Sequence, residues 1–122
     1  MDARELVLRH WEAANARDWA AFAALLADDL LYEVPQTGER VRGAAGYLDF
    51  FRTWPGDWRA EPVRVIAQDD TVVTVIDFRT PDGVETGIGI FAVADGRITR
   101  ITDYWPAPYD PPPRLSAFVE KT

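Results

Sequence analysis

Apolar residues in the first third of the chain recur with the three-to-four-residue spacing of amphipathic helices. Asp2 stands three residues before Glu5, as in a capping box, so a helix is predicted to begin there and to end near Arg17. Its apolar face carries four residues: Val7, His10, Trp11 and Ala14. Asp18 is expected to cap a second, short helix that ends at Asp28-Asp29. That helix would bury three side chains: Phe22, Leu25 and Leu26.

A short strand and a third helix follow in the pattern. Residues 30–34 are predicted to form a strand that stops at Pro35. The polar segment 36–43 is interpreted as a loop whose arginines are solvated. A helix is predicted over residues 44–54, where a Pro-Gly pair ends it. Its apolar stripe is wholly aromatic: Tyr47, Phe50, Phe51 and Trp54.

The second half of the chain is rich in Val, Ile, Thr and aromatic residues. It predicts four strands separated by short polar turns: residues 59–68, 71–80, 84–94 and 97–105. Asp95-Gly96 between two apolar runs is a strong hairpin signal. Proline interrupts both helices and central strands, so the proline cluster from Pro106 to Pro113 is expected to lie extended over the surface.

These elements predict one α+β domain over residues 1–122, with three N-terminal helices packed on a mostly antiparallel sheet and a Pro-rich tail from about residue 106. Hydrophobic residues make up 48% of the chain and charged residues 27%, which is typical of a globular protein. The formal net charge of −7 argues against nucleic acid and against an anionic membrane as partners.

The counts of metal-binding residue types are also informative. Cysteine is absent, which excludes disulfides, thiolate catalysis and thiolate metal sites. With a single histidine, a zinc site is not expected, and no phosphate-binding glycine loop is present, so no cofactor is expected. No apolar run has the length of a signal peptide or a membrane span, so a cytoplasmic location is expected.

The order of these elements, with a first strand ending at Pro35 and a last strand reading Ile101-Thr102-Asp103-Tyr104-Trp105, resembles the SnoaL-like branch of the nuclear-transport-factor-2-like superfamily. The resemblance covers roughly residues 3–106. It implies a strongly curved sheet that forms a cone around an apolar cavity. Members include ketosteroid isomerases, limonene epoxide hydrolases, scytalone dehydratases and polyketide cyclases, so the fold alone does not determine the chemistry.

The ketosteroid isomerases and the epoxide hydrolases each have a set of site residues with matching positions in this sequence. His10 matches the tyrosine of ketosteroid isomerases that donates a hydrogen bond to the substrate oxyanion. The position of the isomerase's catalytic base is occupied here by Val34. The position of its second oxyanion donor falls near Ile88 or Gly89. In the epoxide hydrolases, Asp103 and Asp77 match the two aspartates of the triad. The intervening arginine is Val75 here, and the water-holding Tyr and Asn match Leu31 and Glu33. Neither known mechanism is complete in this sequence.

Four residues are therefore candidates for catalysis: Asp103, Asp77, His10 and Glu33. Asp103 shares a strand face with Ile101 and Trp105, where a carboxylate is costly unless it is paired or catalytic. The alternative is a solvated or structurally paired Asp103. With unbroken register Asp77 would face the other side of the sheet, so a shared cavity requires a bulge, for which Gly87 and Gly89 are the expected hosts.

His10, Glu33 and Asp77 each have an alternative interpretation without a catalytic role. His10 lies on an apolar helix face, where a satisfied core histidine is the more common outcome than a catalyst. Tyr32 and Glu33 alternate, so only one of them can face inward, and the family match favours Glu33. Asp77 is alternatively an exposed strand-end residue near Arg79.

Aromatic residues are expected to line the ligand cavity, bounded by Trp11, Phe51 and Trp105. The further candidates are Tyr32, Tyr47, Trp54 and Trp58. The expected ligand is a small hydrophobic molecule, and the expected chemistry is cofactor-free general acid–base catalysis with Asp103 as base. A binding module without turnover and a dimeric interaction domain are the alternatives. The second face of the sheet is too apolar to leave wet, which predicts a homodimer through the sheet.

Overall fold

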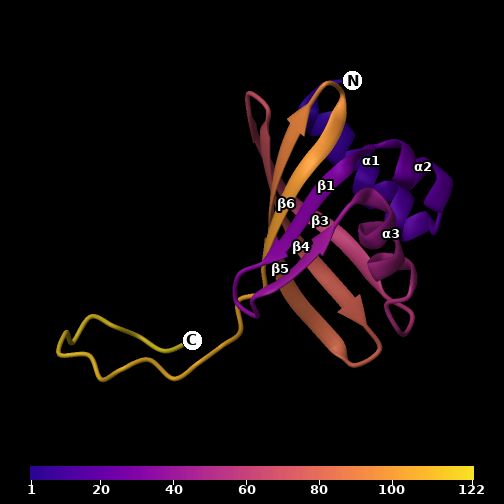
Figure 1. The fold of residues 1–122 in the computed structure, drawn as a ribbon. Helices are drawn as coiled ribbons and strands as arrows, with labels where there is room; N and C mark the ends of the chain where they lie inside the picture. The colour runs from indigo at the N-terminus through magenta and orange to yellow at the C-terminus, as the bar shows by residue number, and fades with distance from the viewer.

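The computed structural model describes residues 1–122 and shows three helices packed into the hollow of a curled, unclosed sheet (Figure 1). The helices are α1 (Ala3–Ala16), α2 (Trp19–Ala24) and α3 (Ala44–Arg52). The six strands follow in chain order as β1 (Leu26–Val34), β2 (Glu39–Arg42), β3 (Arg59–Gln68), β4 (Thr71–Thr80), β5 (Gly83–Ala94) and β6 (Arg97–Tyr104). The α+β architecture predicted from the sequence is confirmed.

Capping residues define the ends of the two N-terminal helices as expected. The Asp2 carboxylate accepts a hydrogen bond from the backbone N–H of Glu5 at 2.8 Å and so caps α1. Arg17 ends α1 in the left-handed conformation, with φ of 58°. Asp18 caps α2 by accepting from the N–H of Ala21 at 3.1 Å.

Two boundaries differ from the prediction because strand pairing overrides the local pattern. The second helix ends at Ala24, not at Asp28-Asp29, and β1 begins at Leu26, four residues before the predicted strand. Leu26 pairs with Ile98 of β6, whose N–H donates to Leu25. The predicted loop 36–43 contains the short strand β2, which pairs antiparallel with β1.

The strand order across the sheet is β2-β1-β6-β5-β4-β3. Only the β1–β6 pair is parallel, and the other four neighbouring pairs are antiparallel. The inward face of the sheet and the helices bury one aromatic-rich core. The register between β5 and β6 shifts at Ala92 and Val93, so the irregularity is at the far end of β5 and not at Gly87 or Gly89.

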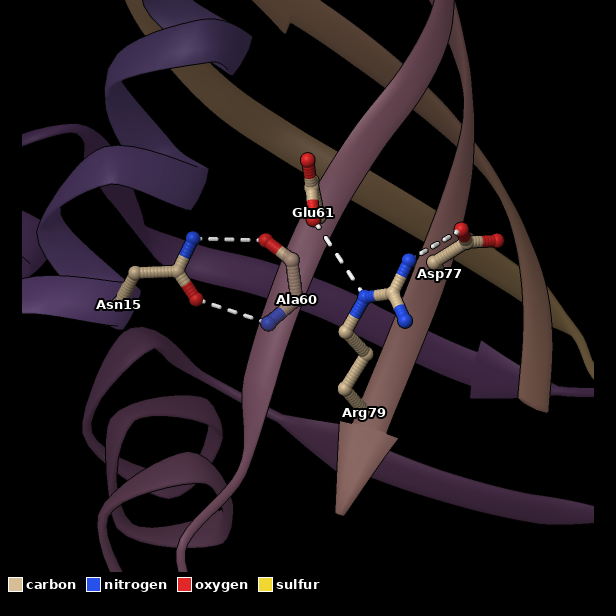
Figure 2. A network of polar contacts seen from close by, with 5 residues as sticks. All are labelled: Asn15, Ala60, Glu61, Asp77 and Arg79. Atoms are coloured by element: carbon tan, nitrogen blue, oxygen red, sulfur yellow. Dashed lines mark hydrogen bonds and ion pairs between the residues drawn. The ribbon is translucent and has the colours of Figure 1, made fainter. Parts of the chain in front are cut away.

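Asn15 fastens α1 to β3, the strand at the edge of the sheet (Figure 2). Its amide nitrogen donates to the carbonyl of Ala60 at 2.6 Å, and the Ala60 N–H donates back to its oxygen at 2.8 Å. Both backbone groups of Ala60 that the sheet leaves free are thereby satisfied. This contact holds the helix across the inward side of the sheet.

The C-terminal tail forms no helix or strand, and every residue from 106 to 122 is exposed. Figure 1 shows the tail extended but leading away from the domain, so the expectation that it lies over the surface is wrong. Its last anchored point is Trp105, whose carbonyl accepts from the Gln36 amide at 3.3 Å. The prolines beyond it remove the N–H groups that could pair with the sheet. None of the three helices has both the length and the apolar character needed to cross a membrane.

Candidate functional site

A cavity of about 310 Å³ lies between the helices and the inward face of the sheet. Its wall is predominantly aromatic: Trp11, Tyr32, Phe50, Phe51, Trp54, Trp58, Phe78 and Trp105. The rest of the lining consists of Val34, Thr37, Glu39, Ile76 and Glu85. The predicted boundary of the cavity by Trp11, Phe51 and Trp105 is confirmed.

Two glycines of β5 make room for the side chains at the inner wall. A methyl group added at Gly87 would come within 2.9 Å of the Trp105 ring and 3.0 Å of Ile76. A methyl group added at Gly89 would come within 2.9 Å of the Asp103 carboxylate. The alternating glycines on one face of β5 therefore leave room for Asp103 of β6 and for Trp105, which follows β6, to point inward.

Asp103 is the one buried carboxylate of this region, with 5% of its surface exposed. The Tyr32 hydroxyl donates a hydrogen bond to its Oδ2 at 2.7 Å. Burial raises the pKa of the Asp103 carboxyl from 3.8 to about 6, against the smaller, lowering effect of the Tyr32 hydrogen bond. Burial and the neighbouring Asp103 charge raise the pKa of Tyr32 far above its usual range, so Tyr32 stays protonated.

Tyr32 contacts both Asp103 and the cavity. Tyr32 lines the cavity wall, whereas Asp103 does not. The two side chains come from β1 and β6, which lie side by side as the parallel pair, with Tyr32 beside Ile101 in the ladder. Tyr32 is therefore the group through which Asp103 is connected to the cavity.

Glu33 faces away from the cavity, which corrects the expectation that it would point inward in place of Tyr32. The alternation of β1 buries Leu30, Tyr32 and Val34 and turns Glu33 to the outer face. There its carboxylate pairs with Arg100 and, at 3.7 Å, with Arg40. Arg40 is thus a paired strand residue and not a solvated loop charge.

Asp77 also lies on the outer face, so the expectation that it shares the cavity with Asp103 is wrong. Asp77 is opposite Thr86 on β5, whereas Asp103 is opposite Gly89. Thr86 and Gly89 are three residues apart, and an odd separation puts them on opposite faces of the strand. Figure 2 shows Asp77 turned toward Arg79, with which it pairs at 3.2 Å.

His10 is a core residue and lines no part of the cavity. Its Nε2 is hydrogen-bonded to the Tyr47 hydroxyl at 2.7 Å, and five aromatic rings surround the imidazole: Trp11, Phe22, Tyr47, Phe51 and Phe91. Burial lowers the pKa of His10 from 6.5 to about 3. His10 is therefore neutral at neutral pH and lies in the core, but its buried Nδ1 has no hydrogen-bond partner, so the alternative of a satisfied core histidine holds for only one of the two ring nitrogens. Its partner Tyr47 is 1% exposed and is not part of the cavity wall, so the expectation that Tyr47 lines the cavity is wrong.

Several lining residues were not singled out from the sequence. Ile76 and Phe78 belong to an apolar strand whose inward face only the packing decides. Glu39 lies on β2, which the polar pattern concealed, and Glu85 lies at the start of β5. In the sequence, the alternation of Gly87 and Gly89 indicated that other side chains fill the space on the inward face of this strand.

The structure contains no cluster of three or more His, Asp or Glu side chains that could hold a metal ion. The chemistry that the site offers is that of a hydrogen-bonded phenol–carboxyl pair at the wall of an aromatic cavity. A carboxyl group with a pKa of about 6 can take up and release protons near neutral pH.

Comparison with known proteins agrees with this architecture. The sequence profile of the SnoaL-like domain matches residues 7–101. A candidate ketosteroid isomerase from Kribbella flavida DSM 17836 is 38% identical and has a TM-score of 0.93, over 98% of this chain and 89% of the other. No curated protein matches the chain.

Two more distant structures have the same fold. An LEH-like epoxide hydrolase from M. tuberculosis is 27% identical with a TM-score of 0.72, over 85% of this chain and 82% of the other. A candidate polyketide cyclase from Pseudomonas putida KT2440 is 27% identical with a TM-score of 0.71, over 87% and 92%. By its sequence profile and by these structural likenesses, the chain belongs to the SnoaL-like family of nuclear-transport-factor-2-like proteins.

Proposed function

We propose that the protein binds a small, largely apolar molecule in the aromatic cavity and transfers a proton on it without a cofactor, through the Tyr32–Asp103 pair. The observation that carries this proposal is the hydrogen bond from a phenol on the cavity wall to a buried carboxylate with a raised pKa. Buried titratable groups with shifted pKa values beside a cavity are typical of catalytic sites.

The proton step follows from this order of groups. A proton leaving the bound molecule passes to the Tyr32 oxygen, while the Tyr32 hydroxyl gives its own proton to Asp103 Oδ2. The products are the deprotonated molecule, a neutral Tyr32 and a protonated Asp103. Reversing the transfer returns the proton to another atom of the molecule, which completes an isomerisation, or to a leaving group. Such positioned acid–base groups contribute roughly 10²–10⁴-fold in rate.

The relatives support this class of reaction. Their names cover ketosteroid isomerisation, epoxide hydrolysis and polyketide cyclisation. All three reactions move protons on largely apolar molecules. We propose the same reaction class for this chain, with Tyr32–Asp103 in place of the family groups that it lacks, because Val34 occupies the position of the isomerase base.

A second candidate function is ligand binding without turnover. It is favoured by one observation, that Asp103 itself is not part of the cavity wall. In that case the Tyr32–Asp103 pair would fix the orientation of a polar group on the ligand and would not exchange protons with it.

The test compares turnover by the wild type with that by Asp103→Asn and Tyr32→Phe on a β,γ-unsaturated ketone, an epoxide and a polyketide-like β-diketone. Asp77→Asn is the matched control, because it removes an aspartate from the outer face of the same sheet. We expect both site variants to lose roughly 10²–10⁴-fold in kcat, and the control to match the wild type. Full turnover by Asp103→Asn would refute proton transfer through this pair. Binding of apolar molecules without turnover by the wild type would establish the second candidate.

A further inference from the structure

Every charged side chain that lines the cavity is acidic. Glu39 and Glu85 are part of its wall, and Asp103 lies directly behind Tyr32. No lysine, arginine or histidine lines it. A site for an anionic ligand would show the reverse distribution of charge.

Two arginines that contact the neighbourhood of the cavity wall, Arg17 and Arg79, have other partners. Arg17 stacks on Trp58 at 3.7 Å from the ring centroid, and its guanidinium donates to the carbonyls of Ala14 and Trp58. Arg79 pairs with Glu61 and Asp77 on the outer face (Figure 2). Neither arginine forms an ion pair with Glu39, Glu85 or Asp103.

Asp103 in particular has no positive partner. Its single side-chain hydrogen bond comes from the neutral hydroxyl of Tyr32, and no salt bridge includes it. Buried carboxylates in proteins are ordinarily paired with a cation, because an isolated charge is costly to remove from water. A cation on a ligand in the cavity would offset this charge from beyond Tyr32, because Asp103 itself is not part of the cavity wall.

The wall itself also favours a cation. Eight of its 13 residues are aromatic, and four of those are tryptophans, the side chain that attracts cations most strongly. Their ring faces carry partial negative charge, so an ammonium group within about 6 Å of them is stabilised while its substituents fill the apolar space.

We propose that the molecule bound in this cavity carries a positive charge, as a protonated amine or a quaternary ammonium group on an apolar skeleton. The inference rests on the proposed binding function and specifies the ligand class for it. The aromatic wall takes the apolar skeleton, and Glu39, Glu85 and the Tyr32–Asp103 pair supply the negative potential.

The experiment is calorimetric titration of the full chain with three ligands of one skeleton at pH 7.5 and low salt. They are 4-phenylbutylamine, 4-phenylbutan-1-ol and 4-phenylbutanoate, which carry a positive, no and a negative charge. We expect the amine to bind about tenfold more tightly than the alcohol, as a desolvated cation–π contact predicts, and the carboxylate to bind most weakly.

Variants locate the source of the preference. The Glu39→Gln/Glu85→Gln/Asp103→Asn triple variant should bind amine and alcohol with affinities within about threefold of each other. The control Glu12→Gln/Glu120→Gln changes two exposed glutamates outside the cavity and should keep the preference. The quantity compared is the ratio of the amine affinity to the alcohol affinity within each variant. A general effect of the substitutions on folding changes both affinities equally and leaves this ratio unchanged.

The outcomes separate the two proposals. Equal binding of amine and alcohol by the wild type, or tightest binding of the carboxylate, would overturn the cationic ligand and leave the apolar binding site intact. An undiminished amine preference in the triple variant would also overturn it. Binding of none of the three ligands would count against the proposed binding function itself.

Discussion

Two buried titratable side chains have opposite effects on the pH dependence of folding. Asp103 keeps its proton to higher pH in the folded protein than in the unfolded chain, because burial disfavours its carboxylate. His10 loses its proton more easily in the folded protein, because burial disfavours its imidazolium. As pH falls, the folded state therefore gains relative to the unfolded state through Asp103 and loses through His10.

Asp103→Asn should become more stable relative to the wild type as pH rises. Between pH 4 and pH 7 the buried Asp103 carboxyl of the wild type becomes charged without a positive partner. The free energy of unfolding of the wild type falls by about 2 kcal/mol for this reason, for a pKa raised from 3.8 to about 6. Asparagine has no such charge and still accepts from Tyr32. Urea unfolding of both proteins at pH 4 and pH 7 measures the difference. Parallel pH curves would show that Asp103 titrates normally.

His10→Gln should change the pH dependence in the opposite sense. Below pH 6.5 the unfolded wild type binds a proton that the folded protein, with a His10 pKa of about 3, does not. Its free energy of unfolding therefore falls by about 2 kcal/mol more than that of the variant between pH 7 and pH 5. Glutamine keeps a hydrogen-bonding group for Tyr47 and does not titrate. If urea unfolding gives the same difference between the proteins at both pH values, the imidazole is not buried as described.

Some of the site residues could be predicted from the sequence and others could not. Asp103 could be singled out, because a carboxylate between Ile101 and Trp105 is conspicuous on a core strand. The choice between Tyr32 and Glu33 could not be made, because the face of β1 depends on pairing with β6 and β2, far away in the sequence. The family match favoured the wrong one of the two.

At the scale of the elements, β5 controls the inner wall of the cavity. Its inward positions Gly87 and Gly89 leave the space that Trp105 and Asp103 occupy. Because these strand glycines have no positive φ, the need for glycine there is one of space and not of backbone conformation.

Gly89→Ala should displace the Asp103 carboxylate and weaken its contact with Tyr32, since the new methyl group would lie 2.9 Å from Oδ1. Overpacking of this kind costs about 1–3 kcal/mol of stability. We expect a shifted Asp103 pKa and reduced turnover on the substrate panel. Thr86→Ala, on the outer face of the same strand, is the control. Unchanged activity in Gly89→Ala would show that the close approach is not needed.

Element types and most boundaries could be predicted where the pattern is local. The caps at Asp2 and Asp18 and the strands 59–68 and 71–80 agree with the structure. The start of β1 and the whole of β2 could not be predicted, because both depend on the parallel and antiparallel partners of β1. The inward side of each strand follows from the same long-range pairing.

At the scale of the whole molecule, the outer face of the sheet bears two neighbouring rows of apolar side chains. One row crosses β3, β4 and β5 and consists of Ile66, Val73 and Ile90. The next row crosses β4, β5 and β6 and consists of Val75, Ile88 and Tyr104. Ile66 is 54% exposed and Ile90 39%. We propose that a second copy of the chain covers this face, since large wet apolar patches are uncommon on monomers.

Ile90→Arg should give a monomer by light scattering at micromolar concentration, where we expect a dimer for the wild type, because it places a charge in the centre of the patch. Val84→Arg is the control, since Val84 is exposed at the hairpin end of the same strand. A monomeric wild type would rule out this interface.

The most direct test of the account is a carbon-13 NMR titration of the Asp103 carboxyl group, assigned by its loss in Asp103→Asn. We predict a pKa of about 6 in the wild type, above the ordinary 3.8. In Tyr32→Phe the pKa should be higher still, because the Tyr32 hydrogen bond lowers it. It should also move when 4-phenylbutan-1-ol saturates the cavity. A carboxyl that titrates near 3.8 and responds neither to Tyr32→Phe nor to the bound alcohol would contradict the central claim that Tyr32 and Asp103 form one buried proton-transfer pair at this cavity.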